Sequence, residues 1–170
     1  MDTGLGPEMK STGEVLGLAE TFPQALMKAF KGAGLKIPKR GGRIIITVKD
    51  EDKEEVVPIA QGFEKMGIEL MATSGTCEAL KKAGVTCKQV NRVSQAHPNI
   101  LDMIASGTVD LIINTPTKGR KQDTDGFKIR RSAVEHSVGC VTSIDTARAI
   151  LMAREQGRSK DLIPIDITTI

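Results

Sequence analysis

The chain has no tryptophan or tyrosine, and its aromatic residues are four phenylalanines. Proteins that bind single-stranded nucleic acid stack its bases on aromatic side chains, so this scarcity argues against a stacking platform. Neither sign of charge predominates, because 24 basic and 21 acidic side chains leave a formal net charge of only +3. So small a surplus does not indicate a nucleic-acid-binding surface, and we expect no nucleic acid partner.

Cysteines and long apolar runs are few as well. The three cysteines are Cys77, Cys87 and Cys140, an odd number without the Cys-x-x-Cys spacing, which argues against a disulfide framework and a zinc site. No apolar run approaches the roughly 20 residues of a membrane-spanning helix, and the N-terminal MDTGLGPEMKS lacks a signal-peptide core. We therefore expect a cytoplasmic protein without a membrane partner, whose cysteines are small core residues.

The first 42 residues differ from the rest in composition and in predicted secondary structure. Residues 1–42 hold a polar arm broken by glycines, one predicted helix and a linker. Thr21 is expected to cap that helix, with Pro23 in its first turn. Such a segment is too small for a domain, so we interpret 1–42 as the tail of a preceding domain, in a protein that continues upstream of Met1. Residues 43–170 are then the domain proper.

From Arg43 onward, strand and helix patterns alternate. The β-branched run RIIITV (43–48) predicts a strand buried on both faces. Further strands are expected at IELMAT (68–73), TCKQVN (86–91), VDLIINT (109–115) and GCVTS (139–143), and the chain ends in an extended LIPIDI (162–167). Helices are expected between the strands. This alternation predicts an α/β fold, with a parallel sheet covered by helices on both faces.

Three details of these helices can be tested. Pro58 cannot donate to the Glu54 carbonyl, so we expect a distorted first turn in the helix that follows the first strand. The helix in PNILDMIASG is expected to begin at Pro98. The helix in FKIRRSAVEHS (127–137) is expected to bury an apolar stripe made of Ile129, Ala133 and Val134.

Polar side chains follow the predicted strands. Open parallel sheets bind ligands beyond the carboxyl ends of their strands, so the residues at these points are site candidates. They are Thr47 and Lys53 after the first strand, Thr73, Ser74, Gly75 and Thr76 after the second, Asn91 and Arg92 after the third, and Asn114, Thr115, Thr117 and Lys118 after the fourth.

This set suits a phosphate group. Gly75 allows the backbone to approach a ligand closely, and the helix that begins near Thr76 offers free N–H groups. Lys53 adds a positive charge. A few charge-assisted hydrogen bonds of roughly 1.5–3 kcal/mol each would give micromolar affinity, about −8 kcal/mol. An alternative stays open, in which the hydroxyls only cap helices and Lys53 and Arg92 are solvated surface charges.

Groups that could perform chemistry are rare at these positions. No Asp or Glu stands at a predicted strand end, and Asp110 precedes its strand. His97 is the one candidate base, and His136 is expected to stabilise a helix C-terminus. The Walker pattern is absent and no metal-ligand cluster is visible. The sequence thus favours binding over catalysis.

Several motifs point to a known family. EMKSTGEV (8–15) resembles the closing motif of the carbamoyl phosphate-synthesising half of the carbamoyl-phosphate synthase large chain. That chain's C-terminal allosteric domain, of bacterial type, is resembled by TFPQALMKAF, RIIITVKDEDKEEVV, GIELMATSGT, VNRV, DLIINTP and IRRSAVEHSV. The resemblance implies a methylglyoxal-synthase-like, Rossmann-like three-layer fold with a five-stranded parallel sheet.

The resemblance also implies a nucleotide effector, with UMP typically an inhibitor and IMP an activator. Its phosphate would meet Lys53, Thr73 and Thr76. Thr47 replaces a serine of relatives, and Asn114 and Thr115 match an Ile-Asn-Thr segment that lines the same site. Arg92 stands where relatives often carry lysine, which keeps the charge and changes the geometry. Thr117 belongs to a run that departs from the shorter one of some members.

The partners implied by the family are the remainder of the large chain, a small glutamine amidotransferase chain and a possible second copy of the domain. The whole synthase would make carbamoyl phosphate from glutamine, bicarbonate and ATP, with Mg²⁺ or Mn²⁺, for pyrimidine or arginine biosynthesis. This stretch of chain would need no cofactor of its own, and ornithine would bind nearer the junction with the preceding domain.

Two other functions stay open. The domain could serve oligomerisation, with a vestigial pocket. It could also be a lyase of the methylglyoxal synthase type with His97 as base. In that enzyme, catalytic aspartates lie in GPxGGDxQ and DPL segments, where this sequence reads SQAHPNI and NTPT, so both aspartates are missing.

Overall fold

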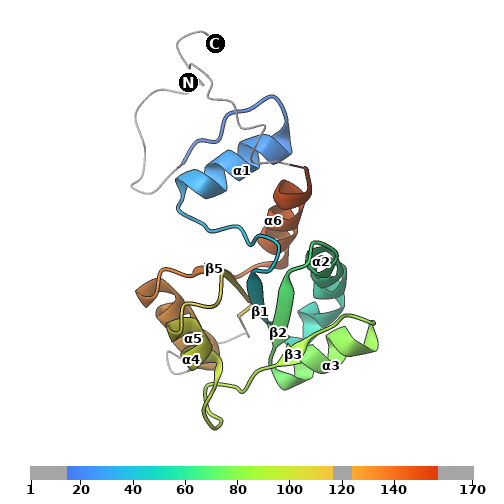
Figure 1. Cartoon of the computed structure of the whole chain (residues 1–170), viewed down its shortest axis with the longest axis vertical. Helices are drawn as coiled ribbons and strands as arrows, with labels where there is room; N and C mark the ends of the chain where they lie inside the picture. The colour runs from blue at the N-terminus through green and yellow to red at the C-terminus, as the bar shows by residue number, and fades with distance from the viewer. Residues whose placement is uncertain (1–14, 117–123, 157–170) are drawn as a thin grey trace.

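The structure is a computed structural model that describes residues 15–116 and 124–156. Its centre is a five-stranded parallel sheet of order β3-β2-β1-β4-β5 (Figure 1). The strands are β1 (Arg43–Thr47), β2 (Glu69–Ala72), β3 (Lys88–Gln89), β4 (Leu111–Asn114) and β5 (Gly139–Val141). The predicted α/β fold with a five-stranded parallel sheet is therefore confirmed.

Helices cover both faces of the sheet. They are α1 (Phe22–Gly32), α2 (Lys53–Lys65), α3 (Ser74–Lys82), α4 (Ile100–Ala105), α5 (Asp125–Glu135) and α6 (Ile144–Gln156), and a 3₁₀ turn, η1 (Asp50–Asp52), precedes α2. Residues of α2, α3 and α6 share one apolar cluster, and residues of α4 and α5 share the other.

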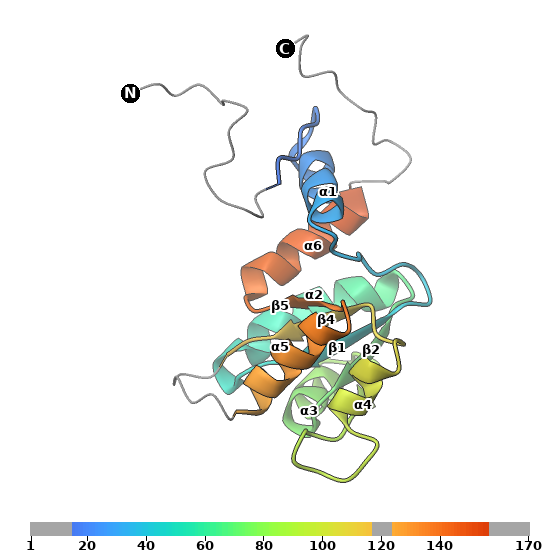
Figure 2. The ribbon, with the colours of Figure 1, turned by 90° about the vertical axis from the view of Figure 1, so that its left-hand side faces the viewer.

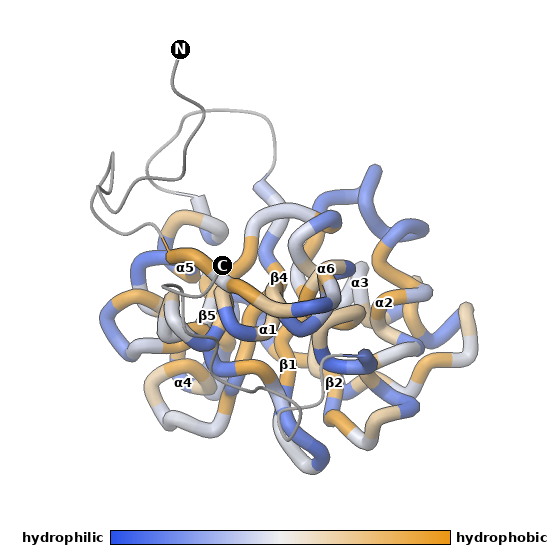
Figure 3. The backbone as a smooth tube through the Cα atoms, turned by 90° about the horizontal axis from the view of Figure 1, so that it is seen from above, coloured by the Kyte–Doolittle hydropathy of each residue, from blue (hydrophilic) through white to orange (hydrophobic). Residues whose placement is uncertain are grey.

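The central strand explains why two layers form. Ile44 and Ile46 of β1 belong to the first cluster, and Ile45 belongs to the second. All three side chains are fully buried, because successive residues of a strand point to opposite faces. Hydrophobic residues accordingly gather along β1 and β4 in the middle of the molecule (Figure 3). Burying one such side chain contributes about 1.5–3 kcal/mol.

Helix α1 stands apart from the sheet and lies across α6 (Figure 2). Met27 is its buried residue, and Arg154 of α6 donates to the Pro38 carbonyl of the following linker at 3.1 Å. Thr21 occupies the N-cap position as predicted, but its side chain makes no capping hydrogen bond. The division of the chain at residues 42 and 43 stays a prediction, and the LIPIDI segment lies outside the described residues.

Five expectations about individual elements need correction. Helix α2 runs through Pro58 without interruption, and the irregular turn is η1, before the helix. The loss of one hydrogen bond at Pro58 is tolerated because one face of α2 is buried in the core. Helix α3 already begins at Ser74, and the third strand is reduced to Lys88–Gln89.

The fourth and fifth corrections concern the buried face of α5 and the start of α4. Val134 is 79% exposed, whereas Ile129 and Ala133 are buried, because Val134 lies about 100° further round the helix than Ala133. In α4, Asn99 is the cap instead of Pro98: its side chain accepts from the Leu101 N–H at 2.9 Å and Asp102 accepts from the Asn99 N–H at 2.7 Å. Within the described part of the chain, no helix is long and apolar enough to cross a membrane.

Candidate functional site

A cavity of about 620 Å³ opens at the carboxyl edge of the sheet. Its walls come from the ends of β1, β2 and β4 and from the first turns of α2, α3 and α5. Eight of the predicted site residues line it together, which are Thr47, Lys53, Thr73, Gly75, Thr76, Arg92, Asn114 and Thr115. The rule that ligand sites form beyond strand ends thus located the cavity.

Four of the candidates named from the sequence are not in this group. Ser74 does not line the cavity, although it opens α3. Thr117 lies outside the described residues, as does Lys118. Asn91, also considered, holds a loop in shape, because its amide donates to the carbonyls of Ala96 and Pro98 at 2.9 and 3.2 Å.

One end of the cavity is built around Lys53 and the N-terminus of α3. The Lys53 ammonium lies so near Gly75 that a Cβ on this glycine would be 2.9 Å from Nζ. The absence of a side chain at Gly75 therefore brings a cation and the free N–H groups of the first turn of α3 to the same point. Such an arrangement attracts an anion.

Four of the threonines that line the cavity lie at the ends of β1, β2 and β4 or in the first turn of α3. Thr76 Oγ1 accepts from the Val48 N–H at 3.5 Å, and Thr115 Oγ1 accepts from the Lys49 N–H at 3.0 Å. Thr73 Oγ1 lies 3.4 Å from the hydroxyl of Thr47. The Thr76 and Thr115 hydroxyls are used as acceptors in these contacts, so each keeps a hydrogen that it can donate to a ligand.

The opposite end of the cavity is formed by α5 and the end of β4. Arg130 Nη1 donates to Asn114 Oδ1 at 3.5 Å. A Cβ on Gly126 would lie 3.3 Å from both of these atoms, so the glycine makes room for the pair. Phe127 lines this end and is 39% exposed. Sequence reasoning found Asn114 at this end but missed the residues of α5, although the helix that follows a strand starts at the same edge of the sheet and could have been included.

The charges that line the cavity are mixed, with a surplus of cations. Lys49, Lys53, Arg92 and Arg130 face two acids, Asp50 and Asp125. These acids correct the expectation that carboxylates are absent here: Asp50 belongs to the turn after β1, between Thr47 and Lys53, and Asp125 opens α5.

Asp50 and Lys53 form an ion pair, with Asp50 Oδ1 2.7 Å from Lys53 Nζ. The hydrogen bond from Lys53, the charge of Lys53 and, more weakly, the charge of Arg92 lower the pKa of Asp50. Asp50 is therefore a carboxylate at neutral pH.

His97 is not a base in this cavity. It does not line the cavity, and its Nδ1 lies 2.6 Å from Asp102 Oδ2 at the start of α4. His136 stands at the C-cap of α5, where its Nδ1 is 2.9 Å from the Ser132 carbonyl oxygen. The position of His136 agrees with the prediction. The prediction that His97 is the base at the strand ends is wrong, because His97 contacts Asp102 and does not line the cavity.

The cysteines lack the properties of nucleophiles. Cys77 and Cys87 are buried free thiols. Burial raises the pKa of Cys87 to about 12 and that of Cys140 to about 11, so neither is a thiolate at neutral pH. Among the described residues, no group of three or more His, Cys, Asp or Glu side chains could hold a metal ion.

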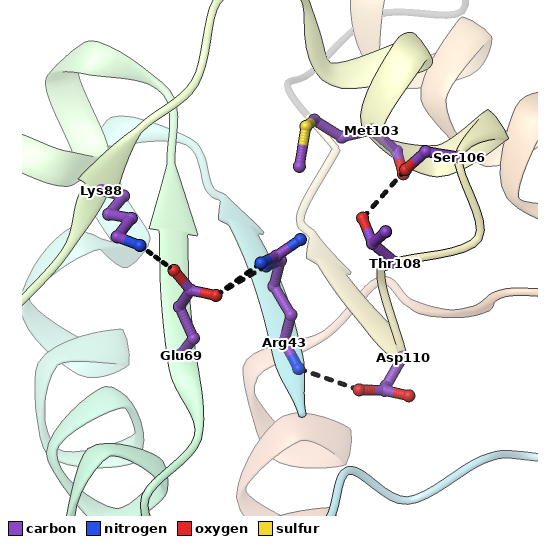
Figure 4. A network of polar contacts seen from close by, with 7 residues as sticks. All are labelled: Arg43, Glu69, Lys88, Met103, Ser106, Thr108 and Asp110. Carbon is purple, nitrogen blue, oxygen red and sulfur yellow. Dashed lines mark hydrogen bonds and ion pairs between the residues drawn. The ribbon is translucent and has the colours of Figure 1, made fainter. Parts of the chain in front are cut away.

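A second polar network lies at the amino ends of the strands (Figure 4). Glu69 of β2 is contacted by Arg43 of β1, at 2.7 Å, and by Lys88 of β3. Asp110 accepts from the Arg43 backbone N–H at 2.8 Å, which confirms that Asp110 is at the end of the sheet away from the cavity. These contacts join four neighbouring strands and are structural.

Comparisons with known proteins agree with the fold and with the motifs. The family model of the MGS-like domain matches residues 55–142. The carbamoyl phosphate synthase large chain of Agathobacter rectalis is 48% identical over 170 residues, which are 99% of this chain and 16% of that one. The corresponding chain of Clostridium botulinum (strain Loch Maree) is 51% identical over 147 residues, 86% of this chain and 14% of that one.

Solved structures show the same fold at low sequence identity. Methylglyoxal synthase from Elizabethkingia anophelis has a TM-score of 0.55 and 24% identity, covering 68% of this chain and 79% of that one. ForH has a TM-score of 0.51 and 18% identity, covering 74% and 85%. These likenesses concern the fold alone.

The two relatives compared by sequence are of one kind, carbamoyl phosphate synthase large chains. The chain spans about one sixth of the length of the large chains that it matches, 16% of the one from Agathobacter rectalis. The resemblance read from the motifs is confirmed by this near-half identity and by the family match. The chain belongs to the MGS-like domain family, and its close relatives are stretches of carbamoyl phosphate synthase large chains.

Proposed function

We propose that this chain is the regulatory domain of a carbamoyl phosphate synthase large chain and that its cavity binds the phosphate of a nucleoside monophosphate, such as UMP or IMP. The observation that carries the proposal is the meeting of Lys53, the hydroxyls of Thr73 and Thr76 and the first turn of α3 at one end of the cavity. A cation, hydroxyls and free N–H groups are what a phosphate monoester needs.

The dimensions of the sheet support a ligand of this length. The phosphate end follows β2 and the other end follows β4, with β1 between them. Two strand spacings amount to about 10 Å, which accommodates a nucleotide from phosphate to base. In this proposal Asn114, Thr115 and Arg130 lie toward the sugar and base, and Arg92 flanks the phosphate.

In this proposal the domain senses and does not catalyse. The described residues that line the cavity include no histidine or cysteine, and one of the two acids, Asp50, is paired with Lys53. The synthesis from glutamine, bicarbonate and ATP, with Mg²⁺ or Mn²⁺, would be carried out by the remainder of the large chain and a small amidotransferase chain. No cofactor is assigned to this stretch.

Regulation requires the effector to bind two states of the whole enzyme with different affinity, and coupling free energies of about 1–3 kcal/mol are usual. Packing suggests a route. Helix α2, which starts with Lys53, lies against α6 so closely that a Cβ on Gly62 would be 2.6 Å from Leu151 Cδ2. Helix α6 in turn holds α1. We place the connection to the remainder of the chain along α2, α6 and α1.

A calorimetric titration tests the proposed site. Wild-type chain and Lys53→Ala are each titrated with UMP and with IMP. We expect micromolar binding of at least one nucleotide by the wild type and a loss of tenfold or more in the variant, which equals about 1.4 kcal/mol. Equal affinities of wild type and variant would contradict the site; no binding at all would favour a domain that serves assembly, with a vestigial pocket.

One observation keeps a second function in view. The fold is shared with a methylglyoxal synthase, and Asp50 and Asp125 line the cavity, so carboxylates are present although the family's two aspartate motifs are not. Release of inorganic phosphate from dihydroxyacetone phosphate, abolished by Asp125→Asn, would establish a lyase. We expect no turnover, because the segments that carry the catalytic aspartates of that enzyme read SQAHPNI and NTPT in this chain.

A further inference from the structure

The phosphate end of the cavity already contains an anion. Asp50 Oδ1 lies 2.7 Å from Lys53 Nζ, and Arg92 is near enough to act on the same carboxylate. Lys53 is the cation that Gly75 admits to the N-terminus of α3. The Asp50 carboxylate therefore engages the group that an incoming phosphate would need most.

The position of Asp50 leaves it free to move away. Its side chain is 91% exposed, whereas that of Lys53 is 25% exposed. Asp50 is the first residue of η1, a single turn whose backbone is closed by the Asp52 N–H donating to the Lys49 carbonyl at 3.1 Å. A rotation of the Asp50 side chain into solvent can thus release Lys53 while the backbone of the turn stays in place.

We propose that Asp50 is an internal counter-anion of the site, which a phosphate group must displace from Lys53, and which thereby sets the affinity of the cavity for its ligand. This inference rests on the proposed function. A doubly charged phosphate monoester competes well with one carboxylate for Lys53, and a singly charged or neutral ligand competes poorly. Asp50 therefore lowers the affinity of the cavity for ligands whose phosphate needs Lys53, and a ligand without a phosphate is unaffected by it.

The size of the effect follows from the exposure of the pair. Exposed ion pairs are weak because water screens them, so the competition by Asp50 is modest. Removing its charge is expected to tighten binding of a phosphate ligand by about threefold to fivefold. The gain has to disappear when Lys53 is absent, because in that case Asp50 has no cation to withhold.

The test compares Asp50→Asn with a matched control, Glu54→Gln. Glu54 is an exposed acid beside Lys53 in sequence, and it does not line the described cavity. Both substitutions remove one negative charge and are nearly isosteric. Affinities for inorganic phosphate, UMP and uridine are measured by calorimetry for the wild type, both variants, Lys53→Ala and the double variant Asp50→Asn/Lys53→Ala.

We expect Asp50→Asn to tighten phosphate and UMP binding threefold to fivefold, Glu54→Gln to change it by less than 1.5-fold, uridine to show no gain, and the double variant to bind like Lys53→Ala. Binding by Asp50→Asn alone would also support the inference. If the wild type binds UMP and Asp50→Asn gains nothing, or no more than Glu54→Gln, Asp50 is not a counter-anion and the proposed function stands. If neither the wild type nor Asp50→Asn binds, both proposals fail.

Discussion

Gly75 offers a way to damage the proposed phosphate site without damaging the fold. A methyl group at this position would place a carbon 2.9 Å from Lys53 Nζ and 3.8 Å from Lys53 Cε. The first distance is shorter than carbon and nitrogen tolerate, so the end of the flexible Lys53 side chain has to shift away from the new methyl group. The backbone itself accepts alanine, because Gly75 lies in a helical turn without a positive φ.

Gly75→Ala should have opposite effects on phosphate binding and on the stability of the fold. A charge-assisted hydrogen bond contributes roughly 1.5–3 kcal/mol, so displacing Lys53 should weaken phosphate binding by about tenfold or more. Alanine is favoured over glycine inside helices by up to about 1 kcal/mol, which for a chain of this size is about 2–4 °C in melting temperature. Gly75→Ala should therefore bind UMP poorly and melt at or slightly above the wild-type temperature.

The assay is a calorimetric titration with UMP, combined with thermal unfolding followed by circular dichroism. Ser74→Ala is the matched control, since Ser74 is the neighbouring residue of the same turn and does not line the cavity. Its affinity should stay within twofold of the wild type. Wild-type affinity in Gly75→Ala, or a large drop in its melting temperature, would refute the reasoning about Lys53 and α3.

Two further predictions concern stability. The contacts of Lys88 and Arg43 lower the pKa of Glu69 below its usual value of 4.5. The stabilisation of the fold by this carboxylate is therefore present above that pH and is lost as the pH falls through the lower folded-state pKa. Glu69→Gln should flatten the acid limb of a urea-denaturation series in which the free energy of unfolding is measured against pH, and an unchanged limb would contradict this. Val134 is 79% exposed and Ile129 is buried. Val134→Ser should therefore change the free energy of unfolding by less than about 0.5 kcal/mol, and Ile129→Ser should change it by several times more. Similar losses in both variants would contradict the assigned buried face of α5.

The sheet could be predicted because its signal is local. Ile44, Ile45 and Ile46 form an unbroken β-branched run that has no place on a half-exposed strand. The alternation with helical patterns then requires parallel strands, and parallel strands place all their carboxyl ends at one edge. For this reason the cavity residues at the ends of β1, β2 and β4 were found from the sequence.

The missing parts depend on contacts that the sequence pattern does not contain. Arg130 reaches the cavity because α5 starts beside the end of β4, where Asn114 accepts a hydrogen bond from Arg130 although the two residues are sixteen positions apart in the chain. Asp50 enters the cavity through a turn after the end of β1. Val134 looked like part of an apolar stripe, but which face of α5 is buried depends on the packing of α4 and β5 against it.

The most direct test of the nucleotide-binding site follows the backbone amides of the cavity. In a ¹H–¹⁵N NMR titration of the chain with UMP, IMP and uridine, a phosphate at the N-terminus of α3 should shift the resonances of Gly75, Thr76 and Lys53. The account predicts that the two nucleotides cause these shifts at micromolar to sub-millimolar concentration and that uridine, without a phosphate, does not. Saturation by a nucleotide with these three amides unmoved would contradict it.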